Sequence, residues 1–319
     1  MHYTNKKYSI KNFKKIYLMI SANVSTGGPE ALHQLGNILK NDLKKDIQIF
    51  YVPNNHNNPV HSNYKKYNLE FTNKIYDDPE NLLIIPEHFM FLNYSLQFKK
   101  IKKIIWWLSL DNYFGFKFKN ENHKFVRSFI KIPFNFISIF NKFTKYKYGI
   151  LTLQDYLKFY YKFTNIKNHK EVNQASFHLM QSHYVYNFFK KKFKNIKTLF
   201  DYQNQNILNS SRDNNYKKKN LICYSHKSND FINVLKNELN IKFIKLQNFN
   251  QKQIISIFKK TKIYIDFGFH PGKDKMPREA ALFNNCIITN KKGSAKNAID
   301  IPIGNKFKFN EAQSNILSI

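Results

Sequence analysis

Long apolar runs alternate with segments of helical spacing along this chain of 319 residues. Apolar runs without polar alternation are typical of strands that are buried on both faces of a sheet. In the first half of the chain we assign such strands to 15–22, 46–53, 81–89, 102–112 and 176–182. After Pro29, which suits a first helical position, apolar residues recur at helical spacing as far as Leu43. This alternation predicts a parallel sheet covered by helices on both faces.

The same alternation restarts after a polar stretch at 201–220, which lacks periodicity and which we interpret as a linker. Further strands are predicted at 220–225, 242–246, 262–268 and 286–289, with helical spacing between them. We therefore expect two domains, at 1–205 and 216–319, with an aromatic and basic insertion at 113–165 in the first. The second domain is expected to be short, because little of the chain follows residue 309.

The formal charge of +31 resembles that of a nucleic-acid-binding protein, but the type of charge argues against that function. Of the 52 basic residues, only Arg127, Arg212 and Arg278 are arginines, and lysine is the poorer reader of base edges and phosphates. We expect no specific nucleic-acid partner. A basic surface also suits an anionic membrane. In the insertion, 129–143 (FIKIPFNFISIFNKF) predicts such docking, and buried helices are the alternative.

Cys223 and Cys286 each lie in an apolar, strand-like run, which is typical of buried thiols in a reducing compartment. No apolar run reaches membrane-spanning length. We expect a cytoplasmic protein, with a peripheral position at the inner face of the plasma membrane as a further expectation.

Seven of the nine glycines fall in two parts of the chain, and the first of these parts contains Gly27 and Gly28. They separate the first predicted strand from its helix, where backbone N–H groups and the helix N-terminus favour an anion. An ordinary tight turn is the alternative. The full G-x-G-x-x-G pattern is absent, which disfavours a dinucleotide cofactor.

Three loops of the second half are predicted to share one edge of its sheet, the carboxyl edge where open α/β folds bind ligands. The first carries His226 and Lys227, and the third, at 291–295, carries Ser294. The middle loop carries His270 and Lys273. Cationic and N–H-rich loops on one edge predict a pocket for an anionic ligand with two phosphates, although Lys227 is also compatible with a solvated surface lysine.

Arg278 and Glu279 follow the middle loop, at the start of a predicted helix. Arginine is rare here, so a bidentate fork for a phosphate, or for a carboxylate that shapes the loop, explains its presence. Glu279 is predicted in the first helical turn, either stabilising the helix N-terminus or accepting hydrogen bonds from ribose. No Asp-x-Asp triplet and no cysteine–histidine cluster with zinc spacing occurs, so we predict neither a metal nor a cofactor.

Two segments resemble a known family. The N-terminal STGGPEALHQL resembles the donor-side loop of GT-B glycosyltransferases, and PREAALFNNCIITNKKGSA resembles the segment where these enzymes place a helix-borne glutamate, a strand and a small-residue loop. YIDFGFHPGKDKMPREAA and IIWWLSLDN look like a bacterial subgroup linked to capsular and other surface polysaccharides, with a group-1-like C-terminal domain. The resemblance covers about two thirds of the chain. It implies two Rossmann-like domains facing a central cleft, and transfer of a sugar from a nucleotide-sugar donor to a polysaccharide or lipid-linked glycan without a metal.

The resemblance also implies roles for individual residues. Gly27 and Gly28 would face the donor diphosphate, Lys227 and Arg278 would pair with it, and Glu279 would hold the ribose. The widespread retaining families place an earlier glutamate eight positions before the helix-borne one. Here Pro271 occupies that position, so His270 or Lys273 would replace its function, or the stereochemical class differs.

A catalytic base, if one is used, is expected at strand ends of the first domain. Asp111, Glu87 and His88 are the candidates, in that order, although each also suits a turn or a helix start. A non-catalytic relative that binds nucleotide sugars or phosphate is the main alternative to an enzyme, and a basic nucleic-acid-binding protein is the less favoured one.

Overall fold

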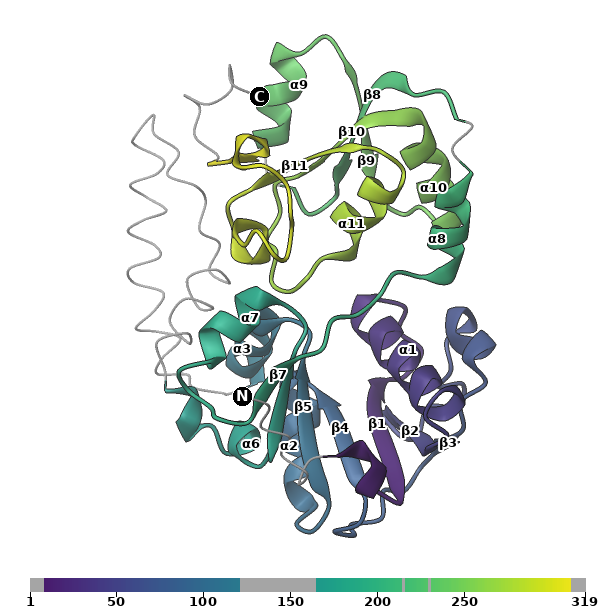
Figure 1. Ribbon diagram of the computed structural model, residues 1–319, viewed down its shortest axis with the longest axis vertical. Coiled ribbons are helices and arrows are strands. Elements are labelled where there is room, and N and C mark those ends of the chain that lie inside the picture. The colour runs from purple at the N-terminus through teal and green to yellow at the C-terminus, as the bar shows by residue number, and fades with distance from the viewer. Residues whose placement is uncertain (1–8, 121–164, 214–215, 229–230, 311–319) are drawn as a thin grey trace. The chain divides into compact units, whose positions relative to one another are not determined.

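The computed structural model describes residues 9–120, 165–213, 216–228 and 231–310 (Figure 1). The chain divides into two compact units, which we describe separately. Unit 1 comprises Met1–Gln181 and Phe189–Asp201, and unit 2 comprises Ser182–Phe188 and Tyr202–Ile319. The division at Asp201–Tyr202 lies at the start of the polar stretch that the sequence analysis interprets as a linker.

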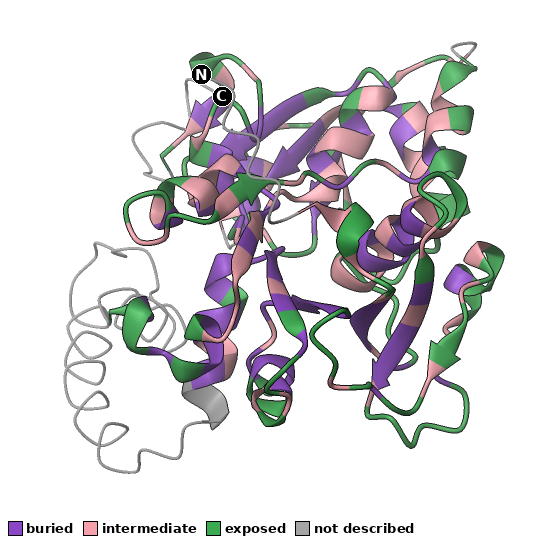
Figure 2. Cartoon of the chain, turned by 60° about the horizontal axis from the view of Figure 1, so that its bottom comes forward, coloured by how far each residue is buried: buried purple, intermediate pink, exposed green. Residues whose placement is uncertain are grey.

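Unit 1 is built on a parallel sheet of seven strands in the order β3-β2-β1-β4-β5-β6-β7. The strands are β1 (Lys15–Ser21), β2 (Asp46–Val52), β3 (Phe71–Thr72), β4 (Leu82–Pro86), β5 (Lys102–Trp107), β6 (Phe177–Met180) and β7 (Ile196–Thr198). The central strands β1 and β4 are the most apolar and are buried along nearly their whole length. Figure 2 shows that many of the strand residues are buried. The predicted parallel sheet is therefore confirmed.

The α-helices of unit 1 connect these strands: α1 (Gly27–Asn41), α2 (Phe89–Tyr94), α3 (Leu110–Asn120), α6 (Lys170–Asn173) and α7 (His183–Phe189), whose first six residues group with unit 2. Short 3-10 turns are η2 (Ile10–Asn12), η3 (Ser62–Tyr67), η4 (Ser95–Gln97) and η5 (Ile166–Asn168). Helix α1 packs on β1 and β2 through its apolar face, which includes Ala31, Leu32 and Leu39. Gly36 permits this close approach, because a Cβ there would lie 3.0 Å from Leu18.

Unit 2 contains a parallel sheet of five strands in the order β12-β11-β10-β8-β9. Its strands are β8 (Lys219–Ser225), β9 (Lys242–Leu246), β10 (Thr261–Asp266), β11 (Cys286–Asn290) and β12 (Lys308–Phe309). Its helices are α8 (Gln205–Arg212), α9 (Phe231–Glu238), α10 (Gln251–Lys260) and α11 (Lys275–Leu282), with 3-10 turns η6 (Gly293–Lys296) and η7 (Asn305–Phe307). Successive residues such as Tyr264 and Ile265 belong to separate apolar clusters, so both faces of the sheet are covered.

Several local predictions are wrong in register or extent. Helices α1 and α11 begin two residues before Pro29 and Pro277, so each proline is a third helical residue, which is tolerated because the first turn needs no N–H donor. Glu279 is consequently the fifth residue of α11. The predicted linker contains α8, whose N-cap is Asn204 and whose Ile207 is buried. Cys223 is buried as predicted, whereas Cys286 is exposed at the start of β11.

The predicted insertion lies largely outside the described residues: 110–120 form α3, and the membrane-docking segment 129–143 is not described. Among the helices that the structure describes, none is both long and apolar enough to span a membrane.

Candidate functional site

Three neighbouring strands of unit 2 present the predicted loops at one edge. β11, β10 and β8 lie side by side and are parallel, and they end at Asn290, Asp266 and Ser225. The loops that follow them carry the predicted residues His226, Lys227, His270, Lys273 and Ser294. The shared edge predicted from the sequence is therefore confirmed.

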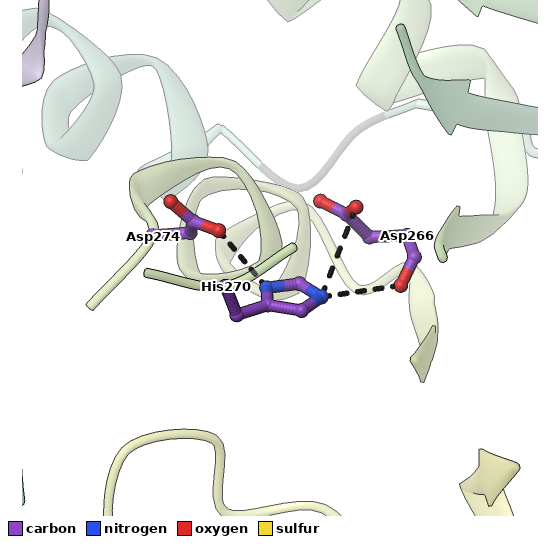
Figure 3. A group of neighbouring side chains, drawn as sticks. All are labelled: Asp266, His270 and Asp274. Carbon is purple, nitrogen blue, oxygen red and sulfur yellow. Dashed lines mark hydrogen bonds and ion pairs between the residues drawn. The ribbon is translucent and has the colours of Figure 1, made fainter. Parts of the chain in front are cut away.

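His270 is the centre of the loop that follows β10, where its ring lies between two carboxylates (Figure 3). Its Nδ1 is 2.9 Å from Oδ2 of Asp274, and its Nε2 is 3.8 Å from Oδ1 of Asp266 and 3.3 Å from the Asp266 carbonyl. The side chain is fully buried. Burial lowers the pKa of His270, but Asp274 and Asp266 outweigh that effect and raise the pKa above its ordinary value. Both ring nitrogens therefore hold the loop together.

Asp266 is itself fixed at the end of β10. Its Oδ2 accepts a hydrogen bond from the Tyr264 hydroxyl at 2.8 Å, and its Oδ1 accepts one from the Gly268 amide at 3.1 Å. Burial raises the pKa of Asp266 above its ordinary value, although the charge of His270 acts in the opposite direction. The buried carboxylate thus joins the strand, the loop and the imidazole in one network.

The loop after β11 packs directly on the loop after β10. The Ser294 amide donates to the His270 carbonyl at 2.8 Å, and the Ser294 hydroxyl donates to the Gly272 carbonyl at 2.6 Å. Gly293 has a φ of +51°, and a Cβ at this position would overlap the His270 carbonyl. Ser294 is completely buried, so in this structure its hydroxyl supports the loop rather than facing solvent.

The loop after β8 also meets the middle loop. A Cβ on Gly268 would lie 3.1 Å from both Cβ and the carbonyl oxygen of Lys227, so only a residue without a side chain fits easily here. Asn290, at the end of β11, donates to the Gly268 carbonyl at 2.8 Å. The side chains of His226 and Lys227 are exposed. Lys227 is therefore anchored by its backbone and has its ammonium group available to a ligand.

Arg278 uses part of its guanidinium to shape the middle loop. Its Nε donates to the Asp274 carbonyl at 3.2 Å, and its Nη2 donates to the Lys273 carbonyl at 3.0 Å. Of the two roles predicted for this arginine, the structure thus contains loop shaping, in which the guanidinium bonds to backbone carbonyls. Lys273 and Glu279 are half-buried.

Gly27 and Gly28 form the first turn of α1 in unit 1. A Cβ on Gly27 would meet nothing within 4 Å, and one on Gly28 would make ordinary contact with Leu108 at 3.5 Å. Space is therefore open at this helix N-terminus, where the backbone N–H groups favour an anion. His33 links this turn to Tyr51. Its Nδ1 donates to the Pro29 carbonyl at 2.7 Å, and its Nε2 lies 2.9 Å from the Tyr51 hydroxyl.

The candidate bases of unit 1 occupy the carboxyl ends of the neighbouring strands β4 and β5. Glu87 is buried, and its Oε2 accepts a hydrogen bond from the Leu108 amide at 2.9 Å. Burial raises the pKa of Glu87 to about 7, against the lowering effect of backbone hydrogen bonds. His88 contacts the rings of Phe91 and Phe116, and burial lowers its pKa. Asp111 is buried in the first turn of α3.

Sequence reasoning missed Asp266 and Asp274 as site residues. Their spacing of four residues on either side of His270 is a visible signal, but i, i+4 spacing predicts side-chain contact only where the segment is expected to be helical. Here the chain forms a compact loop instead. Tyr264 and Asn290 were also missed, because each appears in the sequence as an ordinary strand residue.

One ligand atom each from Asp266, His270 and Asp274 could also meet at a metal ion, since these atoms lie within 4.8 Å of one another. The two carboxylates, however, face different nitrogens of the same ring. A single ion could bind only one of those nitrogens. The geometry therefore fits an imidazolium between two carboxylates better than a metal site.

Several solved structures are similar to this chain in fold, whereas no family model and no curated protein sequence matches it. A sucrose-phosphate synthase from Thermosynechococcus elongatus aligns with 96% of this chain and 88% of its own, at 9% identity and a TM-score of 0.55. A glycosyltransferase from Rickettsia africae ESF-5 aligns with 93% of this chain and 84% of its own, at 11% identity and a TM-score of 0.52. At these identities they show the fold, which is the GT-B class with two Rossmann-like α/β domains in one chain.

Proposed function

We propose that this chain is a glycosyltransferase that binds a nucleotide-sugar donor at the carboxyl edge of the unit 2 sheet. The observation that carries the proposal is the assembly of three loops around His270, with Lys227 exposed beside them. The GT-B fold supports it, as does the resemblance of the two glycine- and glutamate-bearing segments to enzymes of that class.

The site residues divide into two groups by their contacts. The side chains of His270, Ser294 and Arg278 hold the loop. When both aspartates beside His270 are ionised, the group of these three residues has no net positive charge that would attract a diphosphate. We therefore assign contact with the donor phosphates to Lys227 and Lys273, and contact with the ribose to Glu279. Cations at this position stabilise a departing nucleoside diphosphate without a metal, because its developing negative charge is met by fixed positive groups.

Unit 1 would supply the acceptor side and, for an inverting reaction, a base. The raised pKa of Glu87 supports it ahead of Asp111 and His88, because a base works best with a pKa near the working pH. From the family resemblance, the acceptor would be a polysaccharide or a lipid-linked glycan of the bacterial surface. The charge of +31 supports a peripheral position on an anionic membrane in the cytoplasm.

A relative that binds nucleotide sugars without catalysis is the second candidate. It is favoured by the burial of Glu87 and Asp111, since a buried carboxylate is poorly placed to accept an acceptor proton, and Glu87 already accepts a hydrogen bond from the Leu108 amide. Calorimetric binding of a panel of sugar nucleotides, combined with measurement of free nucleoside diphosphate, separates the two. Binding with release supports the enzyme, binding without release supports the relative, and no binding rejects both.

A further inference from the structure

A cavity of about 430 Å³, which is wide open to solvent, lies in unit 2 at the edge of the sheet opposite the candidate donor loops. Its walls come from the start of β8 and from α10. β8 begins at Lys219, which lines the cavity, and ends at Ser225, just before the donor loop. A strand of this length spans about 20 Å, so the cavity and the candidate donor site are separate places in the unit.

Lysines make up most of the residues that line this cavity. Five lysines line it, namely Lys217, Lys219, Lys252, Lys259 and Lys260, and none of the described lining residues is acidic. Lys259 is 3.3 Å from the carboxylate of Asp213, which is mostly exposed. The lysines give this part of unit 2 a net positive charge, which favours binding of an anion.

The cavity also has an ordered aromatic wall. Two ammonium groups lie near the Tyr216 ring, with Nζ of Lys218 at 5.3 Å and Nζ of Lys259 at 5.7 Å from its centroid. Lys218 is held in turn by the Phe258 and Thr261 carbonyls, each at 2.7 Å. The Tyr216 hydroxyl is buried and makes no hydrogen bond within the described residues. The position of this wall is therefore fixed by contacts within unit 2.

We propose that this cavity binds a soluble molecule that carries two or more phosphate groups close together. The number of lysines matches a ligand with several negative charges, and the volume is that of a small-molecule site. The apolar part of the lining, Tyr216 and Ile255, is half-buried instead of projecting into solvent. Apolar side chains that do not project cannot insert into a lipid surface, which favours a soluble ligand over a membrane.

The direct test is lysine acetylation of the intact chain, with and without tripolyphosphate as the probe. At ten times its dissociation constant, tripolyphosphate should slow acetylation of the five cavity lysines by about tenfold. Lys242 and Lys245, exposed on β9 in the same unit, serve as internal controls and should react unchanged. Equal slowing at the control lysines would overturn the proposal, because it would reflect only the overall charge. Protection by phosphatidylglycerol vesicles but not by tripolyphosphate would overturn it too.

A pair of variants with equal change in charge gives an independent measurement. Lys217→Gln with Lys252→Gln should weaken tripolyphosphate binding by about tenfold or more, since two charge-assisted contacts are removed. Lys242→Gln with Lys245→Gln should leave the affinity within about twofold of the parent, as expected for distant surface charges. All four side chains are exposed, so both variants should fold. Equal weakening in both pairs would contradict a defined site. Neither readout depends on glycosyl transfer, so failure of the proposed enzymatic function would leave this result intact.

Discussion

The Nδ1 atom of His270 lies 2.9 Å from Oδ2 of Asp274, the residue that immediately precedes α11. On the other side of the ring, Nε2 faces Asp266 at the end of β10. One buried imidazole therefore connects the end of a strand to the start of the next helix. The loop between them carries Lys273, and its shape depends on that connection.

Gly293→Ala should disrupt this loop, because the residue has a positive φ and a Cβ would overlap the His270 carbonyl. We expect a loss of about 1–3 kcal/mol in stability and weaker donor binding. Gly304→Ala is the matched control, since a Cβ there would make only ordinary contacts. Thermal unfolding and calorimetric binding measure the two effects. If the two variants behave alike, the close packing of the loops is not required.

Arg278→Lys should weaken sugar-nucleotide binding although the charge is kept. A lysine cannot reproduce the two hydrogen bonds to the Lys273 and Asp274 carbonyls, so we expect a loss of about 1–3 kcal/mol in binding free energy. Arg212→Lys, at the exposed end of α8, controls for the substitution itself. Donor affinity equal to that of the parent chain would show that the fork has no part in shaping the site.

The fold was predictable from the sequence wherever apolar runs were long. β1, β8, β10 and β11 match their predicted segments to within two residues, because strands buried on both faces leave a continuous apolar signal. β4 and β5 lie within predicted strands that were too long, since the segments 81–89 and 102–112 continue into α2 and α3. The short edge strands β3, β7 and β12 were not predicted. Two or three residues carry no periodicity, and these strands are fixed by pairing with a neighbour instead.

The positions of the site residues were predictable from the sequence only where they follow from the end of a strand. Parallel strands in the right order brought Lys227, His270 and Ser294 to one edge. Which of them would be buried depended on how the loops fold on one another. The positive φ of Gly293 and the bonds of Ser294 to the middle loop are tertiary features that no local pattern records.

The raised pKa of His270 predicts a pH dependence of stability. A histidine whose pKa is higher in the folded than in the unfolded state contributes stability that is complete below about pH 6.5. That contribution is lost as the pH rises through the folded-state value. His270→Gln should therefore destabilise unit 2 strongly at pH 6 and less at pH 9. Hydrogen exchange of 267–274 in both proteins measures this difference, and a pH-independent difference would exclude a charged His270.

Glu87 makes a separate prediction about activity. If it accepts the acceptor proton, the rate should fall below about pH 7, following its raised pKa, and Glu87→Gln should reduce the rate by about a hundredfold or more. Glu70→Gln, an exposed glutamate of the same unit, should have no such effect. An unchanged rate in Glu87→Gln, together with a large loss of rate in Asp111→Asn, would show that Asp111 and not Glu87 is the catalytic base.

The most direct measurement of the central claim is release of free nucleoside diphosphate from a panel of sugar nucleotides, with EDTA present throughout. The parent chain should release nucleoside diphosphate from at least one donor, and Glu279→Gln should raise KM for that donor by about tenfold or more, because the ribose loses a charge-assisted hydrogen bond. Glu238→Gln, an exposed glutamate of α9, should match the parent. Release from no donor, or release that requires added manganese or magnesium, would contradict a metal-independent glycosyltransferase with its donor site at this edge.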